Sequence, residues 1–212
     1  MSPAQRLIDL SLSAFADELA ARKPTPGGGS QAAFLVATGA ALVSMAFRFT
    51  SGEKFAAVEA TMAARVAELD VLRPKALELV DGDSRAYDAV TAAFGLPKST
   101  ESEKGARTAA IQAALKGALE VPFATMRLAL AGLELAAAGA GDINKNLASD
   151  CAVGASCLAA ALEGAFLNVK INALSMKDAG YVAERLAACE RMRARSNELA
   201  ASVQAAIQRH LA

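Results

Sequence analysis

Aromatic residues, histidine and cysteine are scarce in this chain of 212 residues. Tryptophan is absent, aromatic residues make up 5%, and there is one histidine, His210. The three cysteines (Cys151, Cys157 and Cys189) are an odd number without metal-ligand spacing, so no metal site is predicted. We interpret them as reduced core residues of a cytoplasmic protein, the alternative being a reactive thiol.

An excess of charge is also lacking. The chain has 22 basic and 22 acidic residues and no basic block, so nucleic acid is not expected as a partner. No basic region followed by an apolar stretch opens the chain, and no signal peptide is predicted. The most apolar window, residues 32–47, is too short to span a bilayer comfortably. We interpret it as a buried central helix and expect no membrane partner.

Strand patterns are missing as well, whereas alanine and other helix formers are abundant. Hydrophobic residues make up 54% of the chain. The sequence predicts one all-α domain over residues 1–212, an array of about five to seven helices. Pro74 and Pro122 should each bend a helix, and Pro122 could split one. Helices are expected at about residues 4–22, 29–50, 54–94, 100–138, 146–174 and 178–211.

Two prolines and three glycines precede the second expected helix. The run reads Pro-Thr-Pro-Gly-Gly-Gly-Ser over residues 24–30. Gly27, Gly28 and Gly29 let a ligand approach the backbone, and the N-terminus of the helix expected at 29–50, which includes Ser30, favours an anionic or polar group. No Gly-Lys-Ser/Thr follows and no strand precedes, which excludes a phosphate loop and a dinucleotide fingerprint. The alternative is a tight turn between packed helices.

A carboxylate interrupts the apolar stripe expected along residues 54–94. Steps of three and four residues put one set of positions on a single face, namely Leu69, Leu72, Ala76, Leu79, Asp83, Tyr87 and Val90. A buried carboxylate costs free energy unless it is paired, hydrogen-bonded or used. Asp83 is therefore a candidate functional residue, the alternative being a capped or salt-bridged core aspartate. Asp81 is expected to point elsewhere and meet water.

The helix expected at residues 146–174 has a comparable face. Asp150 lies at one end and Asn168 and Asn172 lie at the other, with small residues between them. Small residues let a second helix or a flat ligand lie close. The alternative is a set of interhelical hydrogen bonds that fix register.

These segments together resemble the formiminotransferase-cyclodeaminase C-terminal domain family, which includes stand-alone bacterial methenyltetrahydrofolate cyclohydrolases. The matching stretches are residues 25–30, 83–88, 96–98 with Glu103, Lys104 and Arg107, then 121–122, 144–150, 168–172 and Asp178. They follow the family's order over nearly the whole chain. Ile143 stands where the family tends to have glycine, which affects the expected shape of the loop at 139–146.

The resemblance implies a dimeric helical array that holds a tetrahydrofolate substrate in a cleft, without a metal or further cofactor. Asp83 and Asp150 are the acidic residues that both lie on expected inward faces and match family motifs. We assign Asp83 as the proton-transfer group and Asp150 as the group that orients water or pterin. The implied substrate-binding residues are Gly27, Gly28, Gly29, Ser30, Tyr87, Asn146, Asn168, Asn172, Lys98 and Arg107. Lys98, Arg107, Lys104 and Lys170 are candidates for the glutamate tail, with solvated surface charge as the alternative.

Three functions remain open from the sequence. The leading one is a cyclohydrolase that opens 5,10-methenyltetrahydrofolate to the 10-formyl form. The second is a cyclodeaminase, a lyase that closes 5-formiminotetrahydrofolate and releases ammonia. The third is a non-catalytic helical scaffold that dimerises. A homodimer is expected in each case, because the Ala/Gly-rich faces of the helices at 29–50 and 146–174 exceed what one array covers.

Overall fold

Helices account for all the regular structure in the part of the chain that is described, residues 6–211 of a computed structural model. The α-helices are α1 (Leu12–Ala20), α2 (Gly28–Arg48), α3 (Glu59–Phe94), α4 (Glu101–Gly139), α5 (Ala148–Ala173) and α6 (Ala179–Leu211). Three single 3₁₀ turns accompany them, namely η1 (Leu7–Asp9), η2 (Glu53–Phe55) and η3 (Lys145–Leu147). The predicted all-α class is confirmed.

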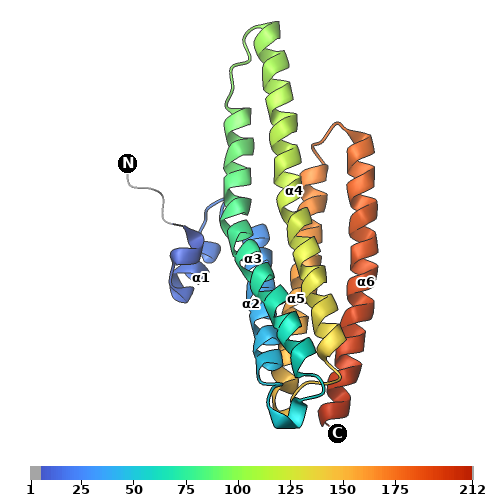
Figure 1. Ribbon diagram of the computed structural model, residues 1–212. Helices are drawn as coiled ribbons and strands as arrows, with labels where there is room; N and C mark the ends of the chain where they lie inside the picture. Colours follow the sequence, from blue (N-terminus) through green and yellow to red (C-terminus); the bar gives the residue numbers. More distant parts are fainter. Residues whose placement is uncertain (1–5, 212) are drawn as a thin grey trace.

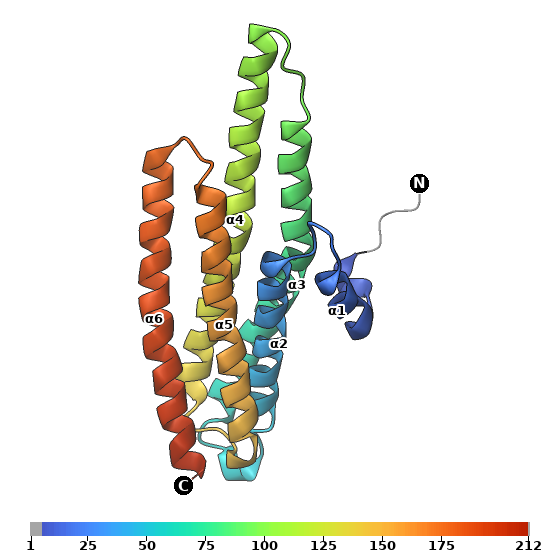
Figure 2. The same cartoon turned by 180° about the vertical axis from the view of Figure 1, so that it is seen from behind.

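Helices α2 to α6 form an elongated bundle, and α1 lies beside it (Figure 1). Helix α5 packs against α2, α4 and α6, whereas α3 packs against α2 and α4. The hairpin made by α3 and α4 extends past the ends of α2 and α5, as both views show (Figure 2). The N-terminus of α2 and the C-terminal part of α5 therefore lie at the base of a projecting arm.

Small residues bring α2 and α5 into close contact. A Cβ added to Gly39 would lie 2.8 Å from the Gly154 carbonyl oxygen, and one added to Gly154 would lie 2.8 Å from that of Gly39. Twelve residues of α2 are buried, most of them alanine, glycine or valine. The small-residue face of α2 is thus largely covered by other helices of the same chain. The prediction that α2 presents more of this surface than one chain can cover was wrong.

The boundaries correct several predictions. The first helix was expected from residue 4, which lies outside the described residues; α1 begins at Leu12, after the separate turn η1. The third helix begins at Glu59 rather than at 54, because η2 precedes it. Asn146 lies in η3, before α5 begins at Ala148.

Neither internal proline ends its helix. Pro74 lies inside the 36 residues of α3 and Pro122 inside the 39 residues of α4, so the predicted split at Pro122 is wrong. Buried residues precede and follow each proline along its helix, such as Leu72 and Ala76 around Pro74, so core packing holds the helix together despite the backbone hydrogen bond that proline removes. The predicted start of α4 is confirmed. There, the Thr100 side chain accepts from Glu103 N at 3.2 Å, and the Glu103 carboxylate accepts from Thr100 N at 2.9 Å.

Three helical stretches are long and apolar enough, by length and composition alone, to cross a membrane. They are Gly28–Arg48, Glu101–Gly139 and Lys145–Ala173. The argument that the first apolar segment is too short was therefore wrong, because α2 has 21 residues. These helices contact one another in the bundle, and 61% of the apolar window of α2 is buried there.

Candidate active site

Asp83 lies at the N-terminus of α2, where it caps the helix from a neighbouring element. Its Oδ2 accepts a hydrogen bond from Ser30 N at 3.0 Å and one from Ser30 Oγ at 3.3 Å. Ser30 Oγ also lies 2.8 Å from the Val80 carbonyl oxygen, to which it can donate. The free N–H groups and dipole of the α2 terminus stabilise the carboxylate.

Gly29 provides the space that this carboxylate occupies. A Cβ added at Gly29 would lie 2.1 Å from Asp83 Oδ1, a distance that no real side chain tolerates. Any other residue would therefore displace the carboxylate or the start of α2. The third glycine of the run is explained by this contact.

Burial and hydrogen bonding act on Asp83 in opposite directions. Burial raises the pKa of its carboxyl group most strongly, whereas the two hydrogen bonds from Ser30 lower it, and the net shift is upward from 3.8. A carboxylate with a raised pKa is a better proton acceptor than an ordinary aspartate.

A cavity of about 310 Å³ opens beside Asp83, at the base of the arm. Five other predicted site residues line it, namely Gly27, Gly28, Tyr87, Asn168 and Asn172. Val90, Leu115 and Ile171 add an apolar wall. The volume is near the low end of the range for small-molecule sites, roughly 300–1,000 Å³. One carboxylate, two amides and an apolar wall suit a flat, partly polar ring system.

The two asparagines also hold the helices that carry them. Asn168 Nδ2 donates to Gly164 O at 2.9 Å, within α5. Asn172 Nδ2 donates to Ala118 O at 2.8 Å, which ties α5 to α4. The alternative of a register-fixing hydrogen bond therefore applies to Asn172, although this residue also lines the cavity.

Asp150 and Asn146 are not part of this cavity. Asp150 is in the first turn of α5, eighteen positions from Asn168, which is about 27 Å at the helical rise. Asn146 is exposed in η3, where its N–H donates to Asn144 Oδ1 at 3.1 Å. Within one chain, Asp150 is thus far from Asn168, with which it shares a helix face, and does not line the cavity beside Asp83.

The basic residues predicted for a glutamate tail differ in their surroundings. The Arg107 guanidinium donates from Nη2 to Phe94 O at 3.0 Å and so fastens the tip of the arm. Lys104 pairs with Glu101 at 2.6 Å, and the Lys170 ammonium lies over the Phe166 ring. Lys98 is exposed in the loop between α3 and α4. Lys98 and Arg107 both belong to the arm that rises above the cavity.

The prediction for Asp81 was wrong. This side chain is 7% exposed, the one buried charged residue among those described, and it is more buried than Asp83. Its Oδ1 accepts a hydrogen bond from Leu7 N at 2.6 Å. The N-terminal segment covers the face of α3 that was expected to meet water. The pattern of apolar residues along α3 alone could not predict this contact between Asp81 and Leu7.

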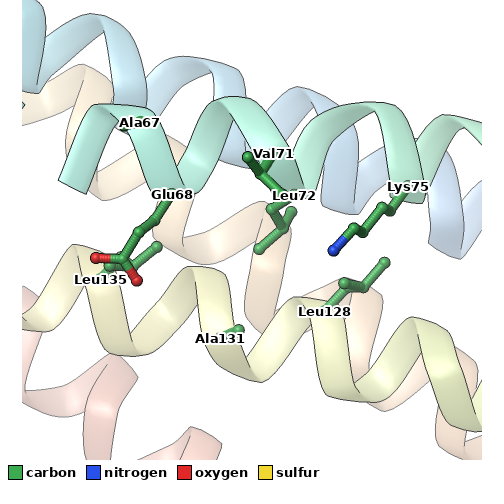
Figure 3. A pocket seen from close by; sticks show the side chains of 8 residues that line it. All are labelled: Ala67, Glu68, Val71, Leu72, Lys75, Leu128, Ala131 and Leu135. Carbon is green, nitrogen blue, oxygen red and sulfur yellow. The ribbon is translucent and has the colours of Figure 1, made fainter. Parts of the chain in front are cut away.

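A second, wider cavity of about 460 Å³ lies between α3 and α4 (Figure 3). Its lining is mostly apolar, and its two charged side chains, Glu68 and Lys75, come from α3. No predicted site residue lines it. The smaller cavity at Asp83 is the better candidate, because its polar groups converge.

Two of the three cysteines are core residues, and Cys157 is partly exposed. Cys151 and Cys189 are fully buried, and burial raises the pKa of each thiol to about 11. Such thiols stay protonated near neutral pH and are poor nucleophiles. Among residues 6–211, no group of three or more His, Cys, Asp or Glu side chains is arranged to hold a metal ion.

Fold and site together define a helical-bundle protein with one hydrogen-bonded carboxylate in a small amide-lined cavity. Residues 11–191 match the family described as Formiminotransferase-cyclodeaminase, and the chain belongs to this family. A methenyltetrahydrofolate cyclohydrolase from Methylorubrum extorquens is 40% identical over 190 residues, covering 89% of this chain and 91% of that protein.

Two further similar proteins are named as cyclodeaminases. The formimidoyltransferase-cyclodeaminase of Rattus norvegicus is 39% identical over 181 residues, which cover 83% of this chain but 33% of the rat protein. The crystal structure of a formiminotetrahydrofolate cyclodeaminase from Thermotoga maritima superposes with a TM-score of 0.85 at 31% identity. It covers 96% of this chain and 98% of its own. The predicted family and helical fold are confirmed.

Proposed function

We propose that this protein is a methenyltetrahydrofolate cyclohydrolase and that Asp83 transfers the protons. The observation that carries the proposal is a carboxylate of raised pKa, fixed at a helix N-terminus in a cavity lined by two amides. The relative from Methylorubrum extorquens, matched over nine-tenths of both chains, supports this reaction.

The substrate's chemistry needs such a carboxylate. The methenyl bridge is a cationic carbon between N5 and N10, and a negative charge beside it is stabilising. Asp83 takes a proton from water as the oxygen attacks this carbon, which gives a neutral tetrahedral adduct. The carbon–N5 bond then breaks, Asp83 returns the proton to N5, and the adduct hydroxyl loses its proton to solvent. The products are the 10-formyl compound and one proton.

The cavity suits the reacting end of the substrate. At about 310 Å³ it would hold the pterin ring and the bridge carbon, with the rest of the molecule along the arm of α3 and α4. Asn168 and Asn172 have amide oxygens that can accept from the pterin edge. Tyr87 and Ile171 offer the apolar surface that a ring needs. Lys98, on the arm, is the proposed contact for the glutamate tail.

Cyclodeamination is the second candidate, because the Thermotoga maritima neighbour and the rat relative carry that name. Two assays on the same preparation separate the reactions. Loss of methenyl absorbance measures the cyclohydrolase, and ammonia release from the formimino substrate measures the cyclodeaminase. We expect turnover in the first and at least tenfold less in the second. Ammonia release as the faster reaction would reverse the assignment, and no turnover in either would support a scaffold.

We further propose that the protein works as a homodimer through α5. This helix and its C-cap, Leu174, expose large apolar side chains, with Val153 53%, Leu167 58%, Ile171 61% and Leu174 79% exposed. Val153, Leu167 and Leu174 share one line, because 153, 160, 167 and 174 are seven positions apart. A two-fold axis across α5 would pair these side chains with their copies. An antiparallel pairing would also bring Asp150 of the second copy toward the Asn168 end of the first.

The oligomeric state of a single-substitution variant, measured by sedimentation, tests this interface. Leu167→Glu should shift the protein from dimer to monomer at micromolar concentration, because it buries like charges across the axis. Val71→Glu is the matched control, since Val71 is equally exposed, at 57%, but lies on α3. A monomeric wild type, or dissociation by the Val71 variant alone, would contradict the proposed interface.

A further inference from the structure

One turn of α3 holds two separate segments of the chain. From this turn, Asp81 Oδ1 accepts from Leu7 N at 2.6 Å, and its Oδ2 lies 3.8 Å from Arg6 Nε. From the same turn, the Val80 carbonyl oxygen and Asp83 Oδ2 both contact Ser30. Residues 7 and 30 are therefore fixed to one structural element, and the chain between them is a strap anchored at both ends.

An apolar cluster packs the first half of the strap, residues 7–19, against the bundle. Phe15 packs with Ala33 of α2 and Val80 of α3, joined by Leu7, Ile8, Leu10 and Leu19. The Phe15 and Phe34 rings are 5.3 Å apart. This cluster is separate from the main core, and α1 stands to one side of the bundle in both views (Figures 1 and 2).

The second half of the strap is a wall of the cavity. Pro24, Thr25, Gly27 and Gly28 line the space beside Asp83. Ser30 holds the end of this wall through bonds that do not involve Asp81. The beginning of the strap has one buried polar anchor, which is the bond from Leu7 N to Asp81.

We propose that Asp81 is a positioning residue for substrate binding, acting by anchoring residues 6–22 so that the wall at 24–28 keeps its shape. The proposal rests on the proposed function. Because Asp83 keeps its own bonds to Ser30 when Asp81 is changed, the effect is expected on KM and not on kcat. This outcome is opposite to the one expected for Asp83, two positions away.

The test compares Asp81→Ala with Asp81→Asn. Alanine removes the acceptor and leaves the Leu7 N–H unpaired, and KM for the methenyl substrate should rise roughly tenfold with kcat within about twofold. Asparagine keeps an acceptor oxygen and should restore KM to within about threefold of the wild type. Asp17→Ala, an exposed carboxylate on α1, is the matched control and should leave both constants unchanged.

A second variant removes the donor without altering α3. Leu7→Pro lacks the N–H, and proline fits the first position of η1, since Arg6 before it is extended with ψ 145°. It should raise KM as Asp81→Ala does. Because the Leu7 side chain also packs in the apolar cluster, Leu7→Ala, which keeps the N–H, is its control. Should Asp81→Ala not fold, a KM increase in Leu7→Pro beyond that of Leu7→Ala decides the proposal.

Amide hydrogen exchange provides a readout that needs no substrate. In Asp81→Ala and Leu7→Pro, residues 7–28 should exchange faster, with α5 and α6 unchanged. Faster exchange across the whole bundle would make Asp81 a general stabiliser and overturn the proposal. A fall in kcat at constant KM, or no change in KM, would overturn it as well. A wild type that turns over no folate would refute the proposed function, and exchange would still decide whether the anchor exists.

Discussion

Asp81 and Asp83 lie two positions apart on α3, but their surroundings differ and indicate different roles. Asp81 is almost fully buried under the N-terminal segment and accepts a backbone N–H from it. Asp83 is partly exposed, accepts from Ser30, and faces a cavity. The more buried carboxylate is the structural one, and the carboxylate with access to a ligand is the candidate for chemistry. Burial alone does not identify a functional carboxylate.

Replacing the carboxylate that faces the cavity should have the largest effect. Asp83→Asn keeps an acceptor for Ser30 but cannot take a proton or balance the substrate cation. Turnover should fall by roughly two to four orders of magnitude in the absorbance assay. Asp88→Asn, an exposed residue on the same helix, is the matched control and should stay near wild type. Equal losses of turnover in the Asp83 and Asp88 variants would contradict the catalytic role proposed for Asp83.

The same substitution has a predicted sign for stability. Because the pKa of Asp83 is raised in the folded protein, its ionised form opposes folding above the unfolded pKa. The free energy of unfolding of Asp83→Asn at pH 7 should therefore equal or exceed that of the wild type. This difference should shrink as the pH falls through the raised pKa of the folded protein and should vanish below 3.8. Urea titrations at pH 7 and pH 3 measure it.

Adding one methyl group at Gly29 of α2 tests whether the position of the Asp83 carboxylate matters for turnover. Gly29→Ala places a carbon 2.1 Å from Asp83 Oδ1 and forces the carboxylate to move. Turnover should fall about a hundredfold, since small misplacements of reacting groups are costly. Gly105→Ala on α4, where an added Cβ meets nothing within 4 Å, is the control. Wild-type turnover in Gly29→Ala would mean that the position of Asp83 is unimportant.

Removing the hydroxyl that contacts Asp83 should have a smaller effect. Ser30→Ala deletes one of the two hydrogen bonds that lower the pKa of Asp83, so this pKa should rise further. It should also cost about 1 kcal/mol of stability. A pH profile of turnover and a urea titration test both effects. A shift of the profile toward lower pH would contradict the geometry.

The smallest effect is expected for the thiols. Replacing Cys151, Cys157 and Cys189 by alanine should leave turnover within about twofold, because two of the thiols are buried and remain protonated. A modest loss of stability follows from the volume removed in the core. Loss of activity in a folded variant would reopen a thiol mechanism.

The sequence was a good guide wherever a local rule decides the structure. The helical class, the capping box at Thr100 and the inward position of Asp83 each follow from patterns within one segment. It failed where another segment decides. Asp81 was misjudged because the N-terminal segment folds over it. The separation of Asp150 from Asn168 did follow from the sequence, which puts them eighteen positions apart at opposite ends of one face of α5.

The pH dependence of kcat/KM in the wild type and in Asp83→Asn tests the central claim most directly. A catalytic base must be ionised, so activity should fall on the acidic side with an apparent pKa above 3.8, the ordinary value for aspartate. The residual activity of Asp83→Asn should lack this acidic limb. An unchanged limb in the variant, or a wild-type limb at or below 3.8, would show that Asp83 is not the group that transfers the proton.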